Sequence, residues 1–363
     1  MEGMVAKTDF RLTYANKKVF LTGHTGFKGS WLLYWLELLG AKVKGYSLAP
    51  EPDGFYQLIQ GDSRCQSVVA DIRDAARLQR ELLAFQPDFI FHLAAQPLVR
   101  LSYEIPTETF EVNALGTAYL LNAVRQLFNP CVVVLITTDK VYENKEWHYP
   151  YRESDRLGGY DPYSASKAMA ELVISSYRNS YFNPSNYATH QKTIASARAG
   201  NVIGGGDFAK DRIIPDIVRA LQAGVAITVR NPDAVRPWQH VLEPLGGYLL
   251  LGDTLAKNPT TTDAAWNFGP YMADCLTVRE LVEASITAWE SGTYYVPERG
   301  GQPHEAGLLK LDISKAQSQL GWQPYYNSRQ AIQLTIDWFK QAMVAPDRVA
   351  DFTKSQIEAY MQV

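Results

Sequence analysis

The stretch KKVFLTGHTGFKGSWLLYWLELLG, residues 17–40, joins a short apolar run to a glycine-rich turn and then to a helical pattern. KKVFLT has the length of a buried strand, and WLLYWLELLG repeats apolar residues at the three-to-four spacing of a helix. Between them, Gly23, Gly26 and Gly29 recur every third residue. Such a turn lets backbone N–H groups approach a phosphate at the positive end of the helix dipole. The stretch therefore predicts a strand–turn–helix that binds a dinucleotide, although a tight turn that merely needs small residues has the same pattern.

Strand-like runs alternate with helical patterns through the first half of the chain. Such alternation implies right-handed crossovers and a parallel sheet with helices on both faces. The predicted fold class is therefore α/β: a doubly wound Rossmann parallel sheet with a smaller, mixed α/β C-terminal substrate lobe. The remaining predicted strands are AKVKGYS (41–47), SVVA (67–70), DFIFHLA (88–94), CVVVLIT (131–137) and TIASARA (193–199).

The pattern becomes less regular after about residue 202, where loops, proline and tryptophan are more frequent. We expect residues 1–202 to form the dinucleotide-binding Rossmann domain. Residues 203–233 and 264–363 are expected to form the substrate-binding lobe. The segment 234–263 contains the helical pattern LEPLGGYLLLGDTL, which we expect to pack back onto the sheet.

The composition restricts the class of protein and its partners. Hydrophobic residues make up 46% of the chain and charged residues 20%, as in ordinary globular proteins. The net charge is −3, with no block of one sign, which argues against a nucleic-acid or anionic-membrane partner. The three cysteines lie far apart and suit a reducing cytosol. No signal core or membrane-length apolar run is visible, so a cytoplasmic protein without a metal site is expected.

Two further strand ends carry residues suited to a dinucleotide. Asp71 and Ile72 follow the third run, where a carboxylate and a backbone amide could hold an adenine; a helix N-cap region around Asp74 is the alternative. Leu93-Ala94-Ala95 follows the fourth run and allows close approach of a ligand. The second run ends at Tyr46-Ser47-Leu48, without the acid usual for NAD or an arginine for a 2′-phosphate. NAD is the preferred prediction.

Two polar stretches suggest chemistry. Asp139 and Lys140 stand side by side after the apolar run that ends at Ile136, where an exposed ion pair is the simplest interpretation. Tyr163 and Lys167 are four residues apart and share one face of a predicted helix. A nearby ammonium would lower the pKa of a phenol from ~10 toward the working pH. Such a tyrosinate can remove a proton from a sugar hydroxyl while hydride leaves the same carbon.

Along nearly its whole length the chain resembles the extended short-chain dehydrogenase/reductases that modify nucleotide sugars. The resemblance implies that Tyr163 is the catalytic base, Lys167 its partner and Thr138 a hydroxyl donor to the substrate's O4. It also implies a structural position for Asn113 near the catalytic helix. The motifs are GHTGFKG (23–29), DIRD (71–74), HLAAQ (92–96), VNALGT around Asn113, TTDK (137–140), YSASK (163–167), RAGNVIGGGD (198–207), RPWQHV (236–241) and LGWQP (320–324).

Within that family, the residues after Thr138 resemble those of the 4,6-dehydratases, which carry an Asp-Glu pair where this chain has Asp139-Lys140. Asp139 matches the general acid that helps the C6 hydroxyl leave, and desolvation would have to keep it protonated. Lys140 stands where those dehydratases have the glutamate. It would either act as a neutral base at C5 or stabilise the enolate as a cation while another group or water takes the proton.

The Asp-Lys variant, with GHTGFKG and RPWQHVLEP, is most similar to the members that act on CDP-glucose. This implies conversion of CDP-glucose to CDP-4-keto-6-deoxyglucose by C4 oxidation, loss of water across C5 and C6, and C6 reduction with recycled NAD. The product would serve dideoxysugar and O-antigen (lipopolysaccharide) synthesis. The implied cofactor residues are Gly23, His24, Thr25, Gly26, Phe27, Lys28, Asp71, Ile72, Leu93, Ala94, Ala95, Tyr163 and Lys167.

The resemblance also implies the substrate contacts. Asn201 and Arg236 match residues that contact the diphosphate or sugar, and a guanidinium fork suits two phosphate oxygens. Gln96 and Arg100 are expected to line the sugar pocket. Weaker candidates are Arg212, His240 and His304, whereas Trp238, Trp266 and Trp322 are interpreted as packing residues.

Other functions remain open at this point. A nucleotide-sugar 4-epimerase, a decarboxylase of the same fold or a 4,6-dehydratase for another nucleotide sugar would share most motifs, although Asp139 has no use in epimerisation. A non-catalytic dinucleotide-binding regulator would have no use for the Tyr163/Lys167 pair. The predicted helices at 107–128 and 161–182 commonly pair between subunits in this family, which implies a homodimer and allows a tetramer.

Overall fold

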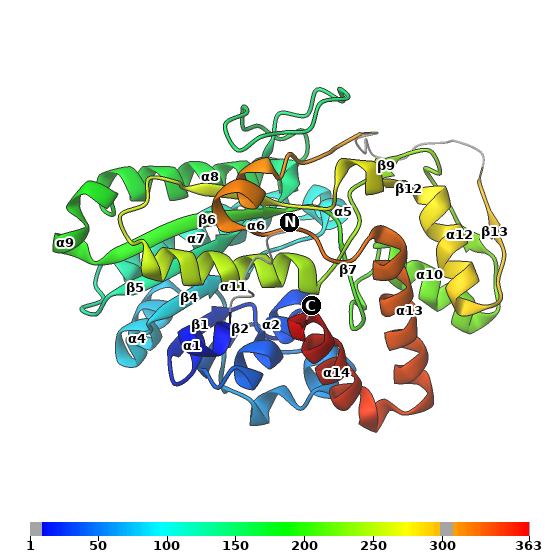
Figure 1. Cartoon of the computed structure of the whole chain (residues 1–363), viewed down its shortest axis with the longest axis horizontal. Helices are drawn as coiled ribbons and strands as arrows, with labels where there is room; N and C mark the ends of the chain where they lie inside the picture. The colour runs from blue at the N-terminus through cyan, green and yellow to red at the C-terminus, as the bar shows by residue number, and fades with distance from the viewer. Residues whose placement is uncertain (1–8, 298–307, 363) are drawn as a thin grey trace, which may run out of the picture.

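The centre of the molecule is a seven-stranded parallel sheet (Figure 1). The computed structural model describes residues 9–297 and 308–362. The strand order is β11-β6-β5-β4-β1-β2-β3, and every neighbouring pair is parallel. All six predicted strands are confirmed. The bounds are β1 Lys18–Thr22, β2 Lys42–Ser47, β3 Gln66–Val69, β4 Phe89–His92, β5 Cys131–Ile136, β6 Lys192–Ala199 and β11 Ala265–Phe268.

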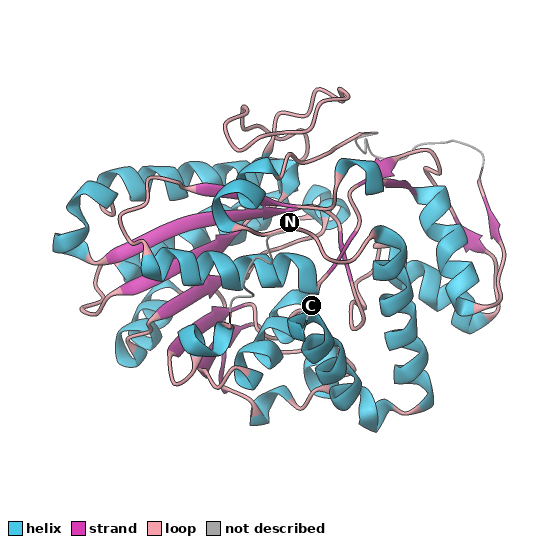
Figure 2. Ribbon diagram, in the orientation of Figure 1, coloured by secondary structure: helices cyan, strands magenta, loops and turns pink. Residues whose placement is uncertain are grey.

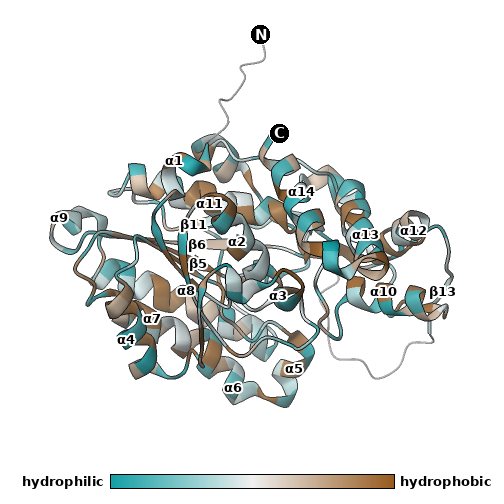
Figure 3. Ribbon diagram, turned by 90° about the horizontal axis from the view of Figure 1, so that it is seen from below, coloured by the Kyte–Doolittle hydropathy of each residue, from teal (hydrophilic) through white to brown (hydrophobic). Residues whose placement is uncertain are grey.

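Helices cover both faces of this sheet, which confirms the doubly wound fold. Alternate residues of each strand point to opposite faces, so Leu21 and Phe91 belong to one apolar core and Phe20 and Ile90 to the other. Figure 3 shows the sheet between α11 on one side and α4 and α7 on the other. The first layer contains α1 Phe10–Tyr14, α2 Phe27–Leu38, α11 Leu242–Lys257 and α14 Val349–Gln362; the second contains α4 Ala75–Phe85, α7 Gly116–Val124 and α8 Pro162–Ser180.

A smaller, mixed α/β lobe extends from the carboxyl ends of the strands (Figures 1 and 2). Its short strands pair two by two, in both parallel and antiparallel fashion. The predicted character of the second lobe is thereby confirmed. Its helices are α10 Ile213–Ala223, α12 Val278–Trp289 and α13 Ser328–Val344; its strand pairs are β7 Val202–Ile203 with β10 Gln239–His240, β9 Val235–Arg236 with β12 Leu276–Thr277, and β8 Ile227–Thr228 with β13 Tyr294–Tyr295.

The expected division of the chain requires corrections in two segments: 264–363, and 234–263, whose strands β9 and β10 pair within the second lobe. β11 lies within the segment 264–363 that was expected to belong to the second lobe, yet it pairs with β6 as the edge strand of the sheet. Trp266 and Phe268 are buried there, and the sequence AWNF has no β-branched residue to mark it as a strand. α14 also leaves the second lobe and packs against α2. α11, within the segment 234–263, contacts β5 and β6.

Several short elements complete the fold around these layers. In the described part of the chain, no helix has the length and apolar character needed to cross a bilayer. The short elements are α3 Phe55–Leu58, α5 Val99–Glu104, α6 Pro106–Phe110 and α9 Tyr187–His190, the π-helical turns η2 Glu111–Leu115 and η6 Ala316–Leu320, and the 3₁₀ turns η1 Gly61–Ser63, η3 Asp139–Val141, η4 Pro184–Asn186, η5 Met272–Asp274 and η7 Pro346–Arg348.

Candidate active site

A cavity of about 1550 Å³ lies at the carboxyl ends of the strands. Its wall on the sheet side includes Thr138 and Tyr163, and its wall on the side of the second lobe includes Ile214, Arg230 and Arg236. In open parallel sheets this edge is where ligands bind. The cavity is large enough for more than one small molecule, because drug-sized ligand pockets span roughly 300–1,000 Å³.

The glycine-rich turn between β1 and α2 is shaped by close backbone contacts. Gly23 has φ +74°, and a Cβ there would lie 2.8 Å from the backbone nitrogen of Ala94. A Cβ at Gly29 would lie 1.9 Å from the carbonyl oxygen of Gly23. Glycine at both positions is therefore required by the turn itself.

Gly26 is different, because the protein's own packing does not require a glycine there. The nearest atom to a Cβ at Gly26 is the Gly23 carbonyl oxygen at 3.5 Å, an ordinary contact. Gly26 caps α2 without any side-chain hydrogen bond, and the first N–H groups of a helix have no partner within it. Open space beside unpaired N–H groups fits a pyrophosphate, so the turn is suited to bind a dinucleotide.

The predicted cradle residues do not all face the cavity. Phe27 and Lys28 line it, whereas the ring of His24 is buried in the core. His24 Nε2 lies 2.8 Å from Ser67 Oγ, and the ring occupies the space that Gly45 leaves free. Burial is the main cause that lowers the pKa of His24 to about 4. Packing under β2 thus holds the His24 ring in the core, and the predicted cofactor contact of His24 stays a prediction.

The remaining predicted cradle residues surround the neighbouring strand ends. Thr25 donates a hydrogen bond to Ser47 Oγ at 2.8 Å. The carboxylate of Asp71 accepts hydrogen bonds from the guanidinium of Arg73. These bonds are the largest cause that lowers the pKa of Asp71. Ile72 is buried against Gly116. Leu93, Ala94 and Ala95 follow β4 and are partly buried.

Asp71 is not the helix cap of this region. Asp74 caps α4 by accepting a hydrogen bond from the backbone nitrogen of Arg77 at 2.9 Å. The N-cap interpretation therefore applies to Asp74 and leaves Asp71 at the strand end.

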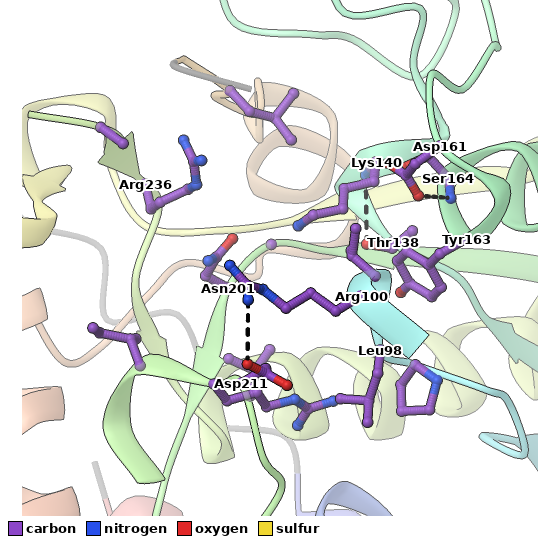
Figure 4. A pocket seen from close by; sticks show the side chains of 18 of the residues that line it. Leu98, Arg100, Thr138, Lys140, Asp161, Tyr163, Ser164, Asn201, Asp211 and Arg236 are labelled. Carbon is purple, nitrogen blue, oxygen red and sulfur yellow. Dashed lines mark hydrogen bonds and ion pairs between the residues drawn. The ribbon is translucent and has the colours of Figure 1, made fainter. Parts of the chain in front are cut away.

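Thr138 and Tyr163 meet at the end of β5. The side chain of Thr138 is one of the groups that lower the pKa of Tyr163, and both residues line the cavity (Figure 4). Asp161 positions the tyrosine because its carboxylate caps α8 and accepts hydrogen bonds from the Ser164 backbone nitrogen and hydroxyl at 2.9 and 2.6 Å.

Tyr163 and Lys167, the expected catalytic pair, have different surroundings in the structure. Burial, the largest cause, raises the pKa of Tyr163 to about 12, although the side chain of Thr138 acts in the opposite direction. Lys167 Nζ donates to the carbonyl oxygen of Ile136 at 3.1 Å. Burial lowers the pKa of Lys167 to about 8, while Glu171 opposes the shift. The lysine thus holds α8 to the strand end, and desolvation outweighs charge attraction at the phenol.

The pair Asp139–Lys140 is not an exposed surface pair. Asp139 is fully buried behind Thr138, whose hydroxyl donates to its Oδ1 at 3.0 Å. Lys140 Nζ lies 3.7 Å from the same oxygen, and this lysine lines the cavity. Asp139 Oδ2 has no hydrogen-bond partner among the described residues and faces Gly200, where a Cβ would approach it to 3.3 Å. The carboxyl group therefore reaches the cavity wall through its contact with Thr138.

Asn113 links the loop after β4 to the catalytic helix. Its Oδ1 accepts from the backbone nitrogen of Gln96 at 2.9 Å, and its Nδ2 donates to Ser166 Oγ at 2.8 Å. Ser166 in turn donates to the carbonyl oxygen of Tyr163 at 2.7 Å. These direct bonds give Asn113 the structural position that was expected for it.

The predicted substrate residues converge on the cavity, with clear exceptions. Arg100, Asn201, Arg212 and Arg236 line it, and Figure 4 shows all but Arg212 labelled around the space beside the catalytic residues. Arg212 pairs with Asp207 at 2.9 Å. Arg100 Nη1 lies 3.6 Å from Asp211 Oδ1 across the cavity wall. Arg236 donates to the carbonyl oxygen of Val235 at 3.0 Å.

Gln96 and His240 lie outside this wall. The Gln96 amide donates to the Leu98 carbonyl oxygen and to Thr109 Oγ1, so its side chain is held within its own loop. His240 is completely buried between Trp31 and Tyr326. Both expectations of a substrate contact are corrected, because internal packing already uses these side chains. His304 lies outside the described residues.

Sequence reasoning missed other residues at the site. Arg230 lines the cavity and pairs with Asp211 at 3.6 Å and with Asp216 at 3.4 Å. The signal for it was a cation in RNPDAVRPW, close to the predicted Arg236. The expected packing tryptophans Trp238, Trp266 and Trp322 are buried in the core, and Trp238 also reaches the cavity wall.

Comparisons with known proteins agree with this geometry. The family described as GDP-mannose 4,6 dehydratase matches residues 20–335. A CDP-glucose 4,6-dehydratase of Salmonella typhimurium (strain LT2) is 47% identical over 349 residues, covering 96% of this chain and 97% of the relative. A dTDP-glucose 4,6-dehydratase of Streptomyces antibioticus is 29% identical over 332 residues, covering 89% of this chain and 92% of the relative.

Solved structures share the fold. The dTDP-glucose 4,6-dehydratase of Streptomyces venezuelae, in a structure with NAD bound, has a TM-score of 0.71 at 25% identity, covering 89% of this chain and 97% of that one. The UDP-glucose 4-epimerase of Thermus thermophilus in complex with NAD has a TM-score of 0.76 at 25% identity, covering 90% and 99%.

Proposed function

The chain belongs to the GDP-mannose 4,6 dehydratase family, and we propose that within this family it is a CDP-D-glucose 4,6-dehydratase. The reaction converts CDP-glucose to CDP-4-keto-6-deoxyglucose. The observation that carries the proposal is the 47% identity to the Salmonella typhimurium protein over nearly the whole of both chains. The cavity adds support, because a dinucleotide cradle and the Thr138/Tyr163 pair open into the same space.

NAD is the cofactor, and its cradle is the turn after β1. When bound, NAD accepts the C4 hydrogen of the substrate as hydride and later returns it to C6. The N–H groups beside Gly26 would hold the pyrophosphate. Phe27, Lys28 and the small residues after β4 would line the rest of the site, with Lys167 on the side of the catalytic helix.

Tyr163 and Thr138 act on the C4 hydroxyl. Thr138 holds this hydroxyl by a hydrogen bond, and Tyr163 takes its proton as C4 becomes a ketone. A buried phenol with a pKa of about 12 needs cations nearby to lose its proton. Arg212 supplies one such charge, since it lowers the pKa of Tyr163 against the larger effect of burial.

Asp139 and Lys140 act in the elimination. The ketone makes the C5 hydrogen acidic, and Lys140 either removes it as a neutral amine or stabilises the resulting enolate as a cation. Asp139 supplies the proton with which the C6 hydroxyl leaves as water. Its hydrogen bond to Thr138 supports this role because it connects the buried carboxyl to the cavity wall.

The nucleotide end of the substrate lies against the second lobe. Arg236 and Arg212 would pair with the diphosphate, Arg100 would line the sugar pocket, and Asn201 would contact the diphosphate or sugar. Asn201 Oδ1 has no partner among the described residues, which supports a ligand contact. We assign the substrate-binding lobe to residues 203–233, to β9 and β10, and to the described part of 264–363 that lies outside β11 and α14, and Arg100 of α5 would reach the substrate from the sheet side.

Product analysis tests the proposed function directly. The protein is incubated with CDP-, dTDP-, GDP- and UDP-glucose, and each product is identified by NMR and mass spectrometry. We expect CDP-glucose alone to lose one water and to give the 4-keto-6-deoxy sugar. Formation of a galactose epimer would instead identify a 4-epimerase. Dehydration of another nucleotide sugar would show that the substrate carries a different nucleobase.

A homodimer formed by α7 and α8 completes the proposal, and a tetramer is its possible extension. Leu115, Met169 and Leu172 on these neighbouring helical segments are apolar and 43–60% exposed, which supports an interface there. Sedimentation of the wild type and of Leu172→Glu tests it: the variant should dissociate to monomers.

The product would feed dideoxysugar and O-antigen synthesis in the cytoplasm. Three free cysteines, at positions 65, 131 and 275, suit that reducing compartment. Deletion of the gene should remove the dideoxysugar from the cell's polysaccharide, and fractionation should recover the enzyme in the cytosol.

A further inference from the structure

Arg198 is bonded to residues on both sides of η3, the short turn that carries the two groups of the elimination step. Its Nε and Nη2 pair with Glu171, whose carboxylate accepts a hydrogen bond from the hydroxyl of Thr137. Its Nη1 donates to the hydroxyl of Tyr142 at 2.9 Å. Thr137 lies two residues before the turn, and Tyr142 directly follows it. One buried guanidinium thereby holds the chain at both ends of η3.

The hydroxyl of Tyr142 has partners on two adjacent strands of the sheet. It accepts the hydrogen bond from Arg198 of β6 and donates to Asn267 Oδ1 of β11 at 2.7 Å. Burial is the largest cause that raises the pKa of Tyr142, so the phenol stays neutral and keeps the proton that it donates. The backbone nitrogen of the same residue caps η3 by donating to the carbonyl oxygen of Asp139. Tyr142 therefore connects the end of the turn to the sheet.

The ring of Tyr142 is fixed separately from its hydroxyl. It is 1% exposed and stacks on the ring of Tyr151, with 5.1 Å between the ring centres and 15° between the planes. Both rings belong to a small apolar cluster that includes Val141, Leu309 and Leu311 and is separate from the two cores of the sheet. A phenylalanine at position 142 would retain this packing and would lose only the two hydrogen bonds of the hydroxyl.

Lys140 depends on such support because its own contacts are long. Its Nζ lies 3.7 Å from Asp139 Oδ1, and its side chain is 32% exposed and lines the cavity (Figure 4). Its backbone nitrogen lies 3.4 Å from Thr138 Oγ1. A lysine has a flexible four-carbon stem, so the place of this amine is set mainly by the backbone of the turn. An error of about 1 Å at a reacting group can cost about 100-fold in rate.

We propose that Tyr142 is a positioning residue for the elimination step, because its hydroxyl holds η3 where Lys140 can act at C5. This inference rests on the proposed function. In that step the C5 proton passes to a base and its bonding electron pair forms the C5–C6 double bond. The C6 hydroxyl leaves as water with a proton from Asp139. The earlier oxidation at C4 uses Thr138, whose neighbour Thr137 is held from the other end of the turn through Glu171.

A purely structural role for the Tyr142 hydroxyl is the alternative. Loss of a hydroxyl that only stabilises the fold would lower the free energy of unfolding and would leave both chemical steps unchanged or slow both alike. A double-variant cycle with Lys140→Met separates the two roles, since residues that act through one another do not have additive effects.

The test measures the two steps on the full chain with NAD and CDP-glucose. Rapid-quench mass spectrometry gives the rate of C4 oxidation from the 4-keto sugar and the rate of elimination from the loss of water. We expect Tyr142→Phe to slow elimination by about 10–100-fold and to leave C4 oxidation nearly unchanged. In the Lys140→Met background the same change should have no further effect on elimination.

Tyr14→Phe is the matched control. It removes another buried tyrosine hydroxyl, which donates to the carbonyl oxygen of Leu249 at 2.7 Å and lies outside the cavity wall. Both rates should be unchanged in this variant, and urea unfolding compares the stability of the two phenylalanine variants.

Equal effects of Tyr142→Phe on the two steps overturn the proposal, and so does an additive loss in the double variant. A Tyr142→Phe protein that does not fold would show that the hydroxyl is purely structural and would overturn it as well. Failure of the proposed function appears in the wild type, as no loss of water from CDP-glucose. If the wild type dehydrates another nucleotide sugar, the same measurements with that sugar decide the role of Tyr142.

Discussion

Glu171 and Arg198 form a bidentate ion pair in the interior, next to Thr137 at the end of β5. Arg198 Nε and Nη2 each lie 2.9 Å from an oxygen of Glu171, and both side chains are 4% exposed. Thr137 and Ser196 donate to the same carboxylate at 2.5 and 2.9 Å. Burial favours a higher pKa for Glu171, yet Arg198 and these hydrogen bonds together hold it below its usual value. The Glu171 carboxylate thus ties α8, which carries Tyr163, to β6 through Arg198 and to the end of β5 through Thr137, the neighbour of Thr138.

Removing one partner of this pair should destabilise the protein strongly. Glu171→Leu leaves the Arg198 charge buried and unpaired, so we expect a loss of about 3–5 kcal/mol in the free energy of unfolding. The double variant Glu171→Leu/Arg198→Met removes both charges and should recover most of that loss. Urea unfolding of the single and double variants measures the difference. Equal stabilities for the two would mean that the pair does not act as a unit.

Tyr163→Phe should abolish turnover while leaving the fold and NAD affinity almost unchanged. The phenol is the proposed base at C4, and loss of a general base costs ~10²–10⁴ in rate. Tyr177→Phe changes another tyrosine of the same helix away from the cavity and serves as the control. A Tyr163→Phe enzyme that keeps more than about a tenth of wild-type turnover would exclude this role.

Asp139→Asn should separate oxidation from elimination. Thr138 and Tyr163 remain in place, so C4 should still be oxidised, but an amide cannot supply the proton for the leaving hydroxyl. Rapid-quench analysis should find the 4-keto sugar accumulating with its C6 hydroxyl intact. Dehydration at the normal rate would contradict the acid role and strengthen the epimerase alternative.

Lys140→Met tests the C5 step independently. If Lys140 acts at C5, exchange of the C5 hydrogen with deuterated solvent should fall together with turnover, by the ~10²–10⁴ of a lost proton-transfer group. The measurement is NMR of the product formed in deuterated water. If turnover fell by less than about threefold, Lys140 would only form an ion pair with Asp139 and would not act at C5.

Arg236→Ala should weaken substrate binding far more than cofactor binding. A charge-assisted hydrogen bond contributes ~1.5–3 kcal/mol, which corresponds to a loss of roughly 10–150-fold in CDP affinity. Arg279→Ala is the matched control, because this arginine belongs to the same lobe but not to the cavity wall. Calorimetry with CDP and with NAD gives both affinities. Unchanged CDP affinity in Arg236→Ala would reject the assignment.

Acid should destabilise the protein through its buried histidines. Burial lowers the pKa of His240 to about 3. Burial is also the largest cause that lowers the pKa of His92 to about 3. Both bind a proton more readily in the unfolded chain, so their contribution to stability is complete above about pH 6.5 and decreases as the pH falls toward 3. Each should add a slope of ~1.4 kcal/mol per pH unit in that range.

His240→Phe isolates one of these contributions. Phenylalanine keeps the aromatic packing against Trp31 and Tyr326 and removes the titrating group. The free energy of unfolding, measured with urea between about pH 7 and about pH 5, should therefore depend less steeply on pH in this variant. The difference in slope should correspond to the loss of one titrating proton. The exposed His148 provides the control variant His148→Gln. An unaltered slope in His240→Phe would show that His240 does not contribute.

The sequence alone determined the fold, because that information is local. Period-two and period-3.6 patterns are properties of neighbouring residues, and they identified six of the seven strands and both helical layers. The glycine spacing at 23–29 likewise specified the turn, since Gly23 and Gly29 are required by contacts close in the chain or to the adjacent strand. β11 was missed because AWNF has no β-branched residue and gains its place only by pairing with β6.

Only the tertiary structure decided which polar side chains face the cavity. His24 and Gln96 stand in the right motifs, but Gly45 and Thr109, distant in sequence, turn their side chains into the protein. Asp139 and Lys140 are adjacent in the chain, yet one is fully buried and the other lines the cavity. Direction, burial and partner are set by packing between distant segments, and no local pattern encodes them.

The same reason explains why Lys28 and Tyr248 could not be paired from the sequence. They are 220 residues apart and meet only because α2 and α11 pack on the same face of the sheet. The sequence determined that a lysine stands at the second position of the helix after the cradle. The tertiary structure placed that lysine beside the ring of Tyr248, because the packing of α2 and α11 on one face of the sheet fixes which of their side chains meet.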